Sequence, residues 1–284
     1  MTNRTDKTNL PLHNLPSLTK LDLEFKQNWL TIWLNQPETR NALDELMLEE
    51  LTHLFHSLQE VENARLVRGI SLRGRGGVFC AGGNLKFFQT ELQATGDKQA
   101  IIAVSNALAE LFHSVHTAPQ FTLVLIEGAA MAGGFGLACC ADMVLCMADA
   151  KFAMTETRIG LSPAQIAPYV IKKLGYAQAR RLLLTGARFD GTQAQTLGFA
   201  DFIATDISEF EKIEKNIKAQ VLACAPQAIA ATKDLLYQTA HADMQQARAI
   251  AAENFYQRMT SDESREGIAA FFEKRKPNWT IDPE

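Results

Sequence analysis

The chain has 284 residues, of which 47% are hydrophobic and 21% charged, with a formal net charge of −4 at pH 7. This composition is ordinary for a soluble globular protein and allows one large core plus a smaller appendage. The acidic balance gives no electrostatic reason to expect nucleic acid or an anionic membrane as a partner. No apolar run is long enough to cross a bilayer, and the N-terminus has no signal-peptide segment, so we expect a cytoplasmic protein.

Residues 1–17 are polar and carry two prolines without periodicity, so we expect a flexible leader. Two strands follow at 18–25 and 30–34, and a hairpin turn at 27–28 joins them. The elements expected next are a helix over 46–58 capped by Asn41 or Asp44, a strand over 67–72, a helix over 98–116, a strand over 121–126, a helix over 133–140 and a strand over 143–147. This alternation predicts a mainly parallel sheet flanked by helices, an α/β fold.

From residue 162 onward the apolar pattern becomes almost wholly helical. The expected helices cover 166–174, 177–184, 206–224, 228–240, 247–259 and 263–274, and one short strand fits at 198–203. This change predicts an α/β core over 18–202 and a helical C-terminal domain over 203–284.

Cysteines and histidines give little indication of a disulfide framework or a metal site. The five cysteines form no Cys-x-x-Cys pair, and four lie in strongly apolar stretches, so we expect buried, reduced thiols. Two histidine pairs have i, i+3 spacing, but no carboxylate or cysteine completes a ligand set, and we expect no metal. The cysteines are Cys80, Cys139, Cys140, Cys146 and Cys224, and the paired histidines are His53, His56, His113 and His116.

Two glycine-rich passages, at 74–84 and 128–136, each follow a buried strand. Glycine lets the backbone approach a ligand closely, and the first amides of a helix have no internal partner. The amides of Gly83 and Gly133 could therefore hold one oxyanion together, although tight packing of small residues explains the same pattern. Glu156 could move a proton at the adjacent carbon, whereas composition alone also fits a solvated or capping glutamate.

Five passages in order resemble the enoyl-CoA hydratase/isomerase family of the crotonase superfamily, over a span from residue 18 to residue 279. The passages are 34–43, 79–85, 128–142, 152–163 and 266–277. Within them, residues 133–137 and 155–168 are similar to bacterial hydratases for isohexenylglutaconyl-CoA and methylglutaconyl-CoA, enzymes of acyclic-terpene and leucine breakdown. No G-x-G-x-x-G or G-x-S-x-G motif supports a dinucleotide oxidoreductase or a serine hydrolase instead.

The resemblance implies a crotonase-like spiral of ββα units with a helical C-terminal oligomerisation region that forms homotrimers or homohexamers. It implies an acyl-CoA substrate whose thioester oxygen lies between the amides of Gly83 and Gly133, with Glu156 as the catalytic acid/base. No separate cofactor is implied, because CoA is part of the substrate. The implied CoA-binding residues are Arg40, Ala42, Ala81, Gly83, Leu85 and Lys274.

Two positions depart from the family pattern. A typical hydratase carries a glutamate three residues after the second oxyanion glycine, where this chain has Gly136, and the usual aspartate of the first loop is Asn84. The missing carboxylate favours an isomerase that moves one proton between C2 and C4. The likeness to glutaconyl-CoA hydratases favours hydration of a substrate that brings its own carboxylate, for which Gly136 would leave room and Lys86 or Arg158 could be the partner.

We therefore expect a hydratase for a branched glutaconyl-CoA ester, with the isohexenyl ester ahead of the 3-methyl ester. A single-glutamate isomerase is the alternative, and a non-catalytic acyl-CoA-binding or RNA-binding protein on the same fold is another. The acidic balance argues against RNA.

Overall fold

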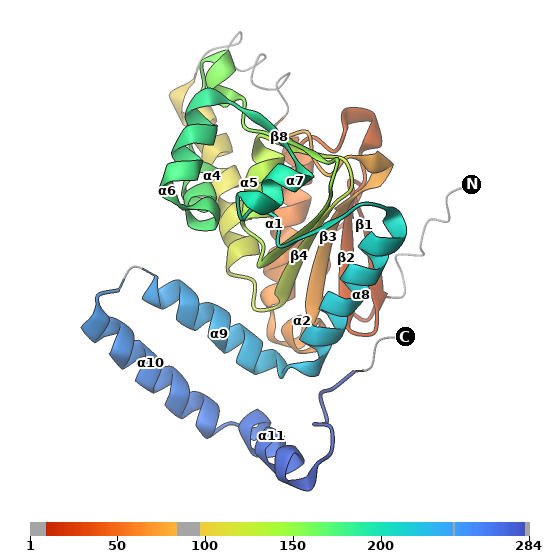
Figure 1. Ribbon diagram of the computed structural model, residues 1–284, viewed down its shortest axis with the longest axis vertical. Coiled ribbons are helices and arrows are strands. Elements are labelled where there is room, and N and C mark those ends of the chain that lie inside the picture. Colours follow the sequence, from red (N-terminus) through yellow and green to blue (C-terminus); the bar gives the residue numbers. More distant parts are fainter. Residues whose placement is uncertain (1–9, 84–96, 241, 282–284) are drawn as a thin grey trace.

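The computed structural model describes residues 10–83, 97–240 and 242–281 (Figure 1). A six-stranded sheet of order β1-β2-β3-β4-β6-β9 forms its centre, and every neighbouring pair except β1–β2 is parallel. Its strands are β1 (Leu21–Lys26), β2 (Trp29–Leu34), β3 (Gly69–Gly74), β4 (Phe121–Ile126), β6 (Met143–Met147) and β9 (Phe202–Ala204). The predicted mainly parallel sheet is confirmed.

A two-residue turn joins β1 to β2. Gln27 and Asn28 both have positive φ, 52° and 59°, which is the conformation of a type I′ hairpin turn. The Asn28 side chain donates to the carbonyl of Leu66, the last residue of α2 (Val61–Leu66), at 2.9 Å, which ties the turn to the end of that helix. The predicted hairpin is therefore present, although neither turn residue is glycine.

Helices cover both faces of the large sheet. Val124 and Ile126 of β4 belong to the core packed under α1 (Glu45–Gln59), α4 (Lys98–His116), α5 (Gly133–Cys139) and α6 (Ala167–Thr185). Leu123 and Leu125 belong to a second core under α8 (Ile207–Ala223). Successive side chains of a strand point to opposite faces, which is why β4 is an uninterrupted apolar run.

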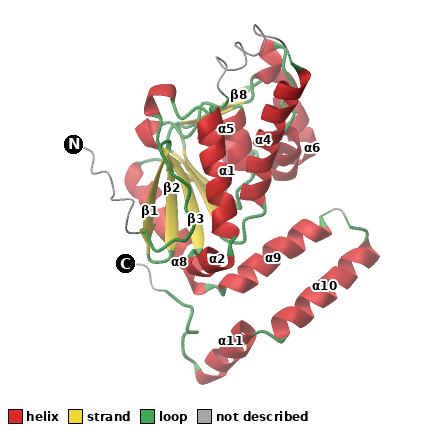
Figure 2. Ribbon diagram, turned by 180° about the vertical axis from the view of Figure 1, so that it is seen from behind, coloured by secondary structure: helices red, strands yellow, loops and turns green. Residues whose placement is uncertain are grey.

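The C-terminal helices form an arm that extends from the sheet in both views (Figures 1 and 2). The arm consists of α9 (Pro226–Thr239), α10 (Met244–Met259) and α11 (Asp262–Glu273). No residue of α9 or α10 is buried, whereas Phe210 and Ile217 of α8 pack on the sheet. The structure therefore places α8 with the core, and the helical arm begins after Cys224 rather than at residue 203.

A second, three-stranded sheet was not expected from the sequence. Its strands are β5 (Ala129–Met131), β7 (Lys151–Ala153) and β8 (Arg188–Asp190), with β5 parallel to β7 and β7 antiparallel to β8. Strands of three residues are too short to show periodicity, so no pattern predicted them. The short helices are α2 (Val61–Leu66), α7 (Gly191–Thr196) and the 3₁₀ helices η2 (Pro37–Thr39), η3 (Arg75–Gly77) and η4 (Glu156–Ile159).

One local expectation changes in the structure, and another is confirmed. Leu10, Leu12 and Leu15 pack against the main core, and the His13 N–H donates to Asn63 Oδ1 at 2.9 Å, so residues 10–15 are not a flexible leader. Helix α6 contains a break at Gly175, with φ 73° and ψ 160°, which agrees with the two helices predicted over 166–174 and 177–184.

The thiols agree in part with expectation. All five cysteines are free, and four are buried, but Cys224 is exposed at the end of α8. Within the described residues, no group of three or more histidine, cysteine or acidic side chains is arranged to hold a metal ion. None of the helices in these same ranges is both long and apolar enough to span a membrane.

Candidate active site

The first site loop follows β3 and runs beside β5. The N–H groups of Phe79 and Cys80 donate to the Ala129 carbonyl at 3.0 and 3.2 Å, and the Met131 N–H donates to the Cys80 carbonyl at 2.9 Å. Gly82 has φ 93°, and a Cβ there would lie 2.8 Å from the Met131 carbonyl oxygen. Only glycine fits this position without displacement of the backbone.

The second site loop turns sharply at Ala132, between β5 and α5. Ala132 has φ 47° and ψ −119°, and its N–H donates to the Ala153 carbonyl at 2.8 Å. A positive φ at a residue other than glycine is strained and persists only where the surroundings hold it. The turn starts α5 at Gly133, whose N–H has no acceptor within the helix.

The structure brings Gly83 and Gly133 together. A Cβ built on Gly133 would lie 3.6 Å from the Gly83 nitrogen and 3.3 Å from Cδ1 of Leu43. Within the described part of the chain, neither glycine N–H donates a hydrogen bond to the backbone. Two neighbouring amides with free donors can together stabilise negative charge on one oxygen.

Glu156 begins η4, soon after the end of β7. Because β7 runs parallel to β5, the segments that lead to Glu156 and to Gly133 leave the small sheet at the same edge. Both carboxylate oxygens of Glu156 are buried, and neither has a hydrogen-bond partner among the residues that the structure describes. This burial raises the pKa of Glu156, and the N–H of its own backbone opposes the shift by a smaller amount. A carboxyl group in such surroundings is suited to proton transfer near neutral pH.

The space next to Gly136 is filled. A Cβ built on Gly136 would lie 2.9 Å from Cγ1 and 3.0 Å from Cγ2 of Ile166, which is itself buried. The expectation that Gly136 leaves room for a substrate carboxylate is therefore wrong. A hydrocarbon side chain from the start of α6 occupies the place where the family pattern has a second glutamate.

Four of the implied CoA-binding residues gather around the first loop. The Ala81 N–H donates to the Arg40 carbonyl at 3.0 Å, and Leu43 pairs with Gly83 in a short parallel bridge. Ala42 lies between Arg40 and this bridge, and the Arg40 side chain is exposed. These residues form a continuous backbone surface beside the Gly83 amide.

The other two implied CoA-binding residues do not join this group within the chain. Leu85 lies outside the described residues, as do Asn84 and Lys86. Lys274 follows α11, and both views show α11 at the opposite end of the molecule from α5 (Figures 1 and 2). Lys274 can contact CoA at this site only from a second copy of the chain.

Arg158, one of two candidate partners for a substrate carboxylate, packs elsewhere. Its Nε would lie 2.9 Å from a Cβ on Gly186, the residue that ends α6, and the Arg158 side chain is exposed. This contact directs the guanidinium toward the end of α6. Arg158 is thus disfavoured as the partner of a carboxylate held near Glu156.

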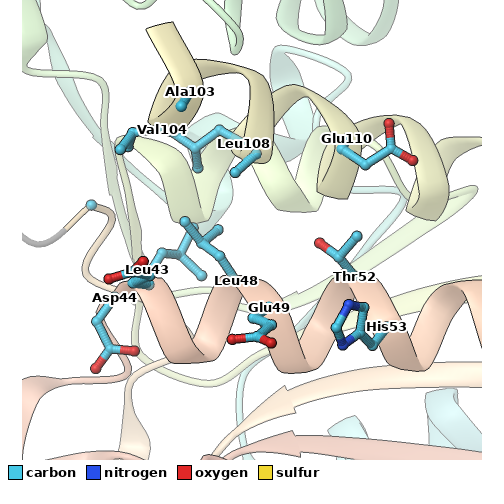
Figure 3. A pocket seen from close by; sticks show the side chains of 13 residues that line it. Leu43, Asp44, Leu48, Glu49, Thr52, His53, Ala103, Val104, Leu108 and Glu110 are labelled. Carbon is cyan, nitrogen blue, oxygen red and sulfur yellow. The ribbon is translucent and has the colours of Figure 1, made fainter. Parts of the chain in front are cut away.

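A cavity of about 430 Å³ opens beside Gly83, between α1 and α4. Figure 3 shows Leu43 and Leu48 facing Val104 and Leu108 across it. Its polar lining is mainly acidic, and of the described lining residues only a histidine could become cationic. The polar lining residues are Asp44, Glu45, Glu49, Thr52, His53 and Glu110. The cavity suits an uncharged aliphatic chain better than a carboxylate.

Asn41 supports the site in a way that sequence reasoning missed. Its buried side chain donates to the carbonyls of Arg75 at 2.9 Å and Val78 at 2.7 Å and accepts from the Gln36 N–H at 2.8 Å. It thereby anchors the start of the first site loop, and the helix cap that it was a candidate for is supplied by Asp44. The positive φ of Asn41, 55°, is tolerated best by asparagine, aspartate and glycine.

The chain matches the model of the enoyl-CoA hydratase/isomerase family over residues 24–282. A curated Thermus thermophilus protein, provisionally named enoyl-CoA hydratase, is 35% identical over 251 residues, which cover 87% of this chain and 96% of that protein. The family match spans the two glycine loops, Glu156 and the helical arm.

Two solved structures share the fold. Pseudomonas aeruginosa AtuE superimposes with a TM-score of 0.88 at 39% sequence identity. The match covers 93% of this chain and 100% of the AtuE chain. An enoyl-CoA hydratase/isomerase from Marinobacter aquaeolei gives a TM-score of 0.86 at 36% identity, with coverage of 92% and 99%. The mixed α/β architecture is therefore the crotonase fold.

Proposed function

The chain belongs to the enoyl-CoA hydratase/isomerase family, and we propose that its reaction is the hydration of a branched glutaconyl-CoA ester. The observation that carries this proposal comes from the described residues: the Glu156 carboxyl group is buried and without a hydrogen-bond partner among them, and the amides of Gly83 and Gly133 donate to no backbone acceptor among them. An acyl-CoA substrate is consistent with the family. The branched glutaconyl group is our proposal, with the isohexenyl ester favoured over the 3-methyl ester.

The proposed reaction uses the residues as follows. The amides of Gly83 and Gly133 bind the thioester oxygen and stabilise the negative charge that develops on it as water attacks. Glu156 takes one proton from water while the water oxygen bonds to C3, and the same carboxyl group then delivers that proton to C2. The C2=C3 π bond is consumed, one C–O and one C–H bond form, and Glu156 returns to its starting state.

The cavity beside Gly83 supports an apolar acyl branch. Leu43, Leu48, Val104 and Leu108 offer an aliphatic lining next to the proposed oxyanion site. Burial of an isohexenyl branch there would stabilise the complex through loss of apolar surface, at about 0.8 kcal/mol for each buried CH₂. The acidic lining would repel the substrate carboxylate, so we place that carboxylate outside this cavity.

We expect wild-type protein to hydrate glutaconyl-type esters far better than plain 2-enoyl esters of equal length. A substrate carboxylate can help hold the attacking water, a role that a second protein carboxylate has in typical hydratases. The measurement is kcat/KM from the loss of conjugated-thioester absorbance for isohexenylglutaconyl-CoA, 3-methylglutaconyl-CoA and crotonyl-CoA. Equal values for crotonyl-CoA and the glutaconyl esters would rule out the proposed substrate class.

Isomerisation is the second candidate, because an apolar Ile166 stands where a second carboxylate would be. In that reaction Glu156 removes a proton from C4 of a 3-enoyl thioester and returns it to C2, so that the double bond moves between C3=C4 and C2=C3. Product analysis distinguishes the two reactions, since only hydration incorporates oxygen from labelled water.

We also propose that the arm assembles the protein into a homotrimer or homohexamer. Large apolar side chains on the arm are exposed in the single chain, including Phe255 at 67%, Phe271 at 76% and Phe272 at 77%. Exposed apolar surface of this kind marks an interface between proteins. A second copy would also be needed to bring Lys274 to a CoA site.

Light scattering after size-exclusion chromatography should give three or six times the mass of one chain. Phe271→Glu should shift the assembly toward smaller species, because a carboxylate would be buried at the interface. Ile101→Glu, at an exposed position of α4 away from the arm, is the matched control. A stable monomer of the wild-type protein at micromolar concentration would contradict both the assembly and the role of Lys274.

A further inference from the structure

The contact between Gly136 and Ile166 leaves no free space for a side chain at residue 136. The built Cβ lies 2.9 Å from Cγ1, 3.0 Å from Cγ2 and 3.3 Å from Cβ of Ile166. Three atoms of one side chain, its branch carbon included, are involved, and a β-branched side chain has few alternative rotamers. Ile166 therefore cannot turn away from residue 136 as the tip of a flexible side chain could.

The backbone around Ile166 is fixed on both sides. Its N–H donates to the Pro163 carbonyl at 3.2 Å, and its carbonyl accepts from the N–H groups of Tyr169 and Val170, both at 3.1 Å. The preceding residue, Gln165, donates from its side chain to Ser105 Oγ of α4 at 2.9 Å. Ile166 is thus held at the junction of α4, α5 and α6, with 7% of its surface exposed.

Helix α6 links the position of Gly136 to the segment that carries Glu156. Helix α6 contacts both α5, which holds Gly136, and η4, which begins with Glu156. No hydrogen-bond donor from the described residues reaches either carboxylate oxygen of Glu156. A water molecule is well held only with two to four polar partners, and Ile166 offers none. On the proposed function, a substrate with a polar group of its own can supply partners for a water molecule next to Glu156.

We infer that Ile166 determines substrate specificity by keeping the position of a second carboxylate apolar and filled. Proton transfer then depends on Glu156 alone, and substrates without a polar group of their own are hydrated slowly. This inference rests on the proposed function and adds to it the residue that restricts the reaction. It also explains why glycine stands at position 136, since any side chain there would collide with Ile166.

The test opens this position in steps. Ile166→Val removes one methyl group with little risk to folding, and Ile166→Ala removes more. Both should raise kcat/KM for crotonyl-CoA, with the larger rise for the alanine variant, because each makes room for water. Values for the glutaconyl ester should stay level or fall. The acid limb of the pH profile should move to lower pH, because water admitted near Glu156 stabilises its charged form.

Val170→Ala is the matched control. Val170 is fully buried one turn further along α6, so its truncation has a similar effect on packing without opening the space next to Gly136. It should leave both the ratio of the two kcat/KM values and the pH profile unchanged. A purely structural role for Ile166 would make the Ile166 and Val170 variants respond alike.

A paired substitution tests the blocked position directly. Gly136→Glu alone should fold poorly, because the new side chain collides with Ile166. Gly136→Glu combined with Ile166→Ala should fold better than Gly136→Glu alone. The double variant should raise crotonyl-CoA hydration above the wild-type value and lower activity on the glutaconyl ester through like-charge repulsion.

Failure of the inference and failure of the proposed function give different results. Wild-type protein that acts on none of the thioesters overturns the proposed function. An active wild-type protein whose Ile166→Val and Ile166→Ala variants change both substrates by the same factor overturns only the role of Ile166. Stable, active Gly136→Glu protein with Ile166 in place would likewise show that Ile166 does not close the position.

Discussion

Replacement of Glu156 by glutamine is expected to lower kcat/KM for the preferred enoyl-CoA ester by about 10²–10⁴-fold, the usual contribution of a general acid–base group. Glutamine keeps the shape of the side chain but cannot take or deliver the proton. Because Gly136 supplies no carboxylate and Ile166 fills the space next to it, the described residues offer no substitute there. The measurement is steady-state hydration with each of the three thioesters.

The pH dependence of the wild-type reaction should show the raised pKa of Glu156. Burial shifts this pKa above the ordinary value of 4.5, so the ionised form that accepts a proton from water becomes populated only at higher pH. We expect kcat/KM to rise with pH through that pKa. The acid limb should be absent from any residual activity of Glu156→Gln.

Stability gives a second readout of the same group. A carboxyl group whose pKa is higher in the folded than in the unfolded protein binds more protons when folded, so stability falls as pH rises between the two pKa values. Glu156→Gln removes this loss. The melting temperature of Glu156→Gln, relative to that of the wild-type protein, should therefore increase as pH rises above about 4.5, the ordinary pKa.

Glu211→Gln is the control for both readouts, because Glu211 is exposed on α8, on the far side of the large sheet from α5. It should change neither activity nor the pH dependence of melting. Retention of wild-type turnover by Glu156→Gln would remove this carboxyl group from the mechanism. Loss of activity together with an unchanged melting profile would indicate a carboxyl group less buried than the structure has it.

The elements that could be predicted from the sequence are those with long, regular apolar patterns. The expected helix over 98–116 and the strands over 121–126 and 143–147 coincide with α4, β4 and β6. Each buries apolar residues at helical or strand spacing, and that pattern can be read locally. Helical periodicity does not reveal whether a helix packs on a sheet, as α8 does, or stands in an arm, so the sequence pattern alone could not place α8.

The site could be predicted only in part. The glycine pair was found because strand-to-loop passages rich in glycine are visible in the sequence. The collision at residue 136 was not, because Gly136 and Ile166 lie far apart in the chain and glycine indicates space only when its surroundings are known. The same holds for Asn41. Its side chain donates to the carbonyls of Arg75 and Val78, which come 34 and 37 residues later in the chain.

Gly133→Pro is expected to lower kcat by about 10²–10³-fold, the usual effect of the loss of one oxyanion donor. Proline lacks the N–H that Gly133 directs toward the proposed thioester oxygen, and it is tolerated at the first residue of a helix, which is where Gly133 lies. The effect should appear mainly in kcat rather than KM, because the charge on the oxygen develops in the transition state. Stopped-flow or steady-state hydration assays measure it.

Gly133→Ala separates the lost donor from the added carbon. Alanine keeps the N–H but places the same Cβ 3.3 Å from Cδ1 of Leu43, a contact that a shift of a few tenths of an ångström relieves. We expect this variant to fold with similar stability to Gly133→Pro and to retain most of its turnover. If the two variants lose the same activity, crowding against Leu43 and the strained turn at Ala132 explain the loss, and the Gly133 amide is not an oxyanion donor. If only Gly133→Pro lowers kcat, and this variant keeps its oligomeric state and melting temperature, the lost N–H donor accounts for the difference.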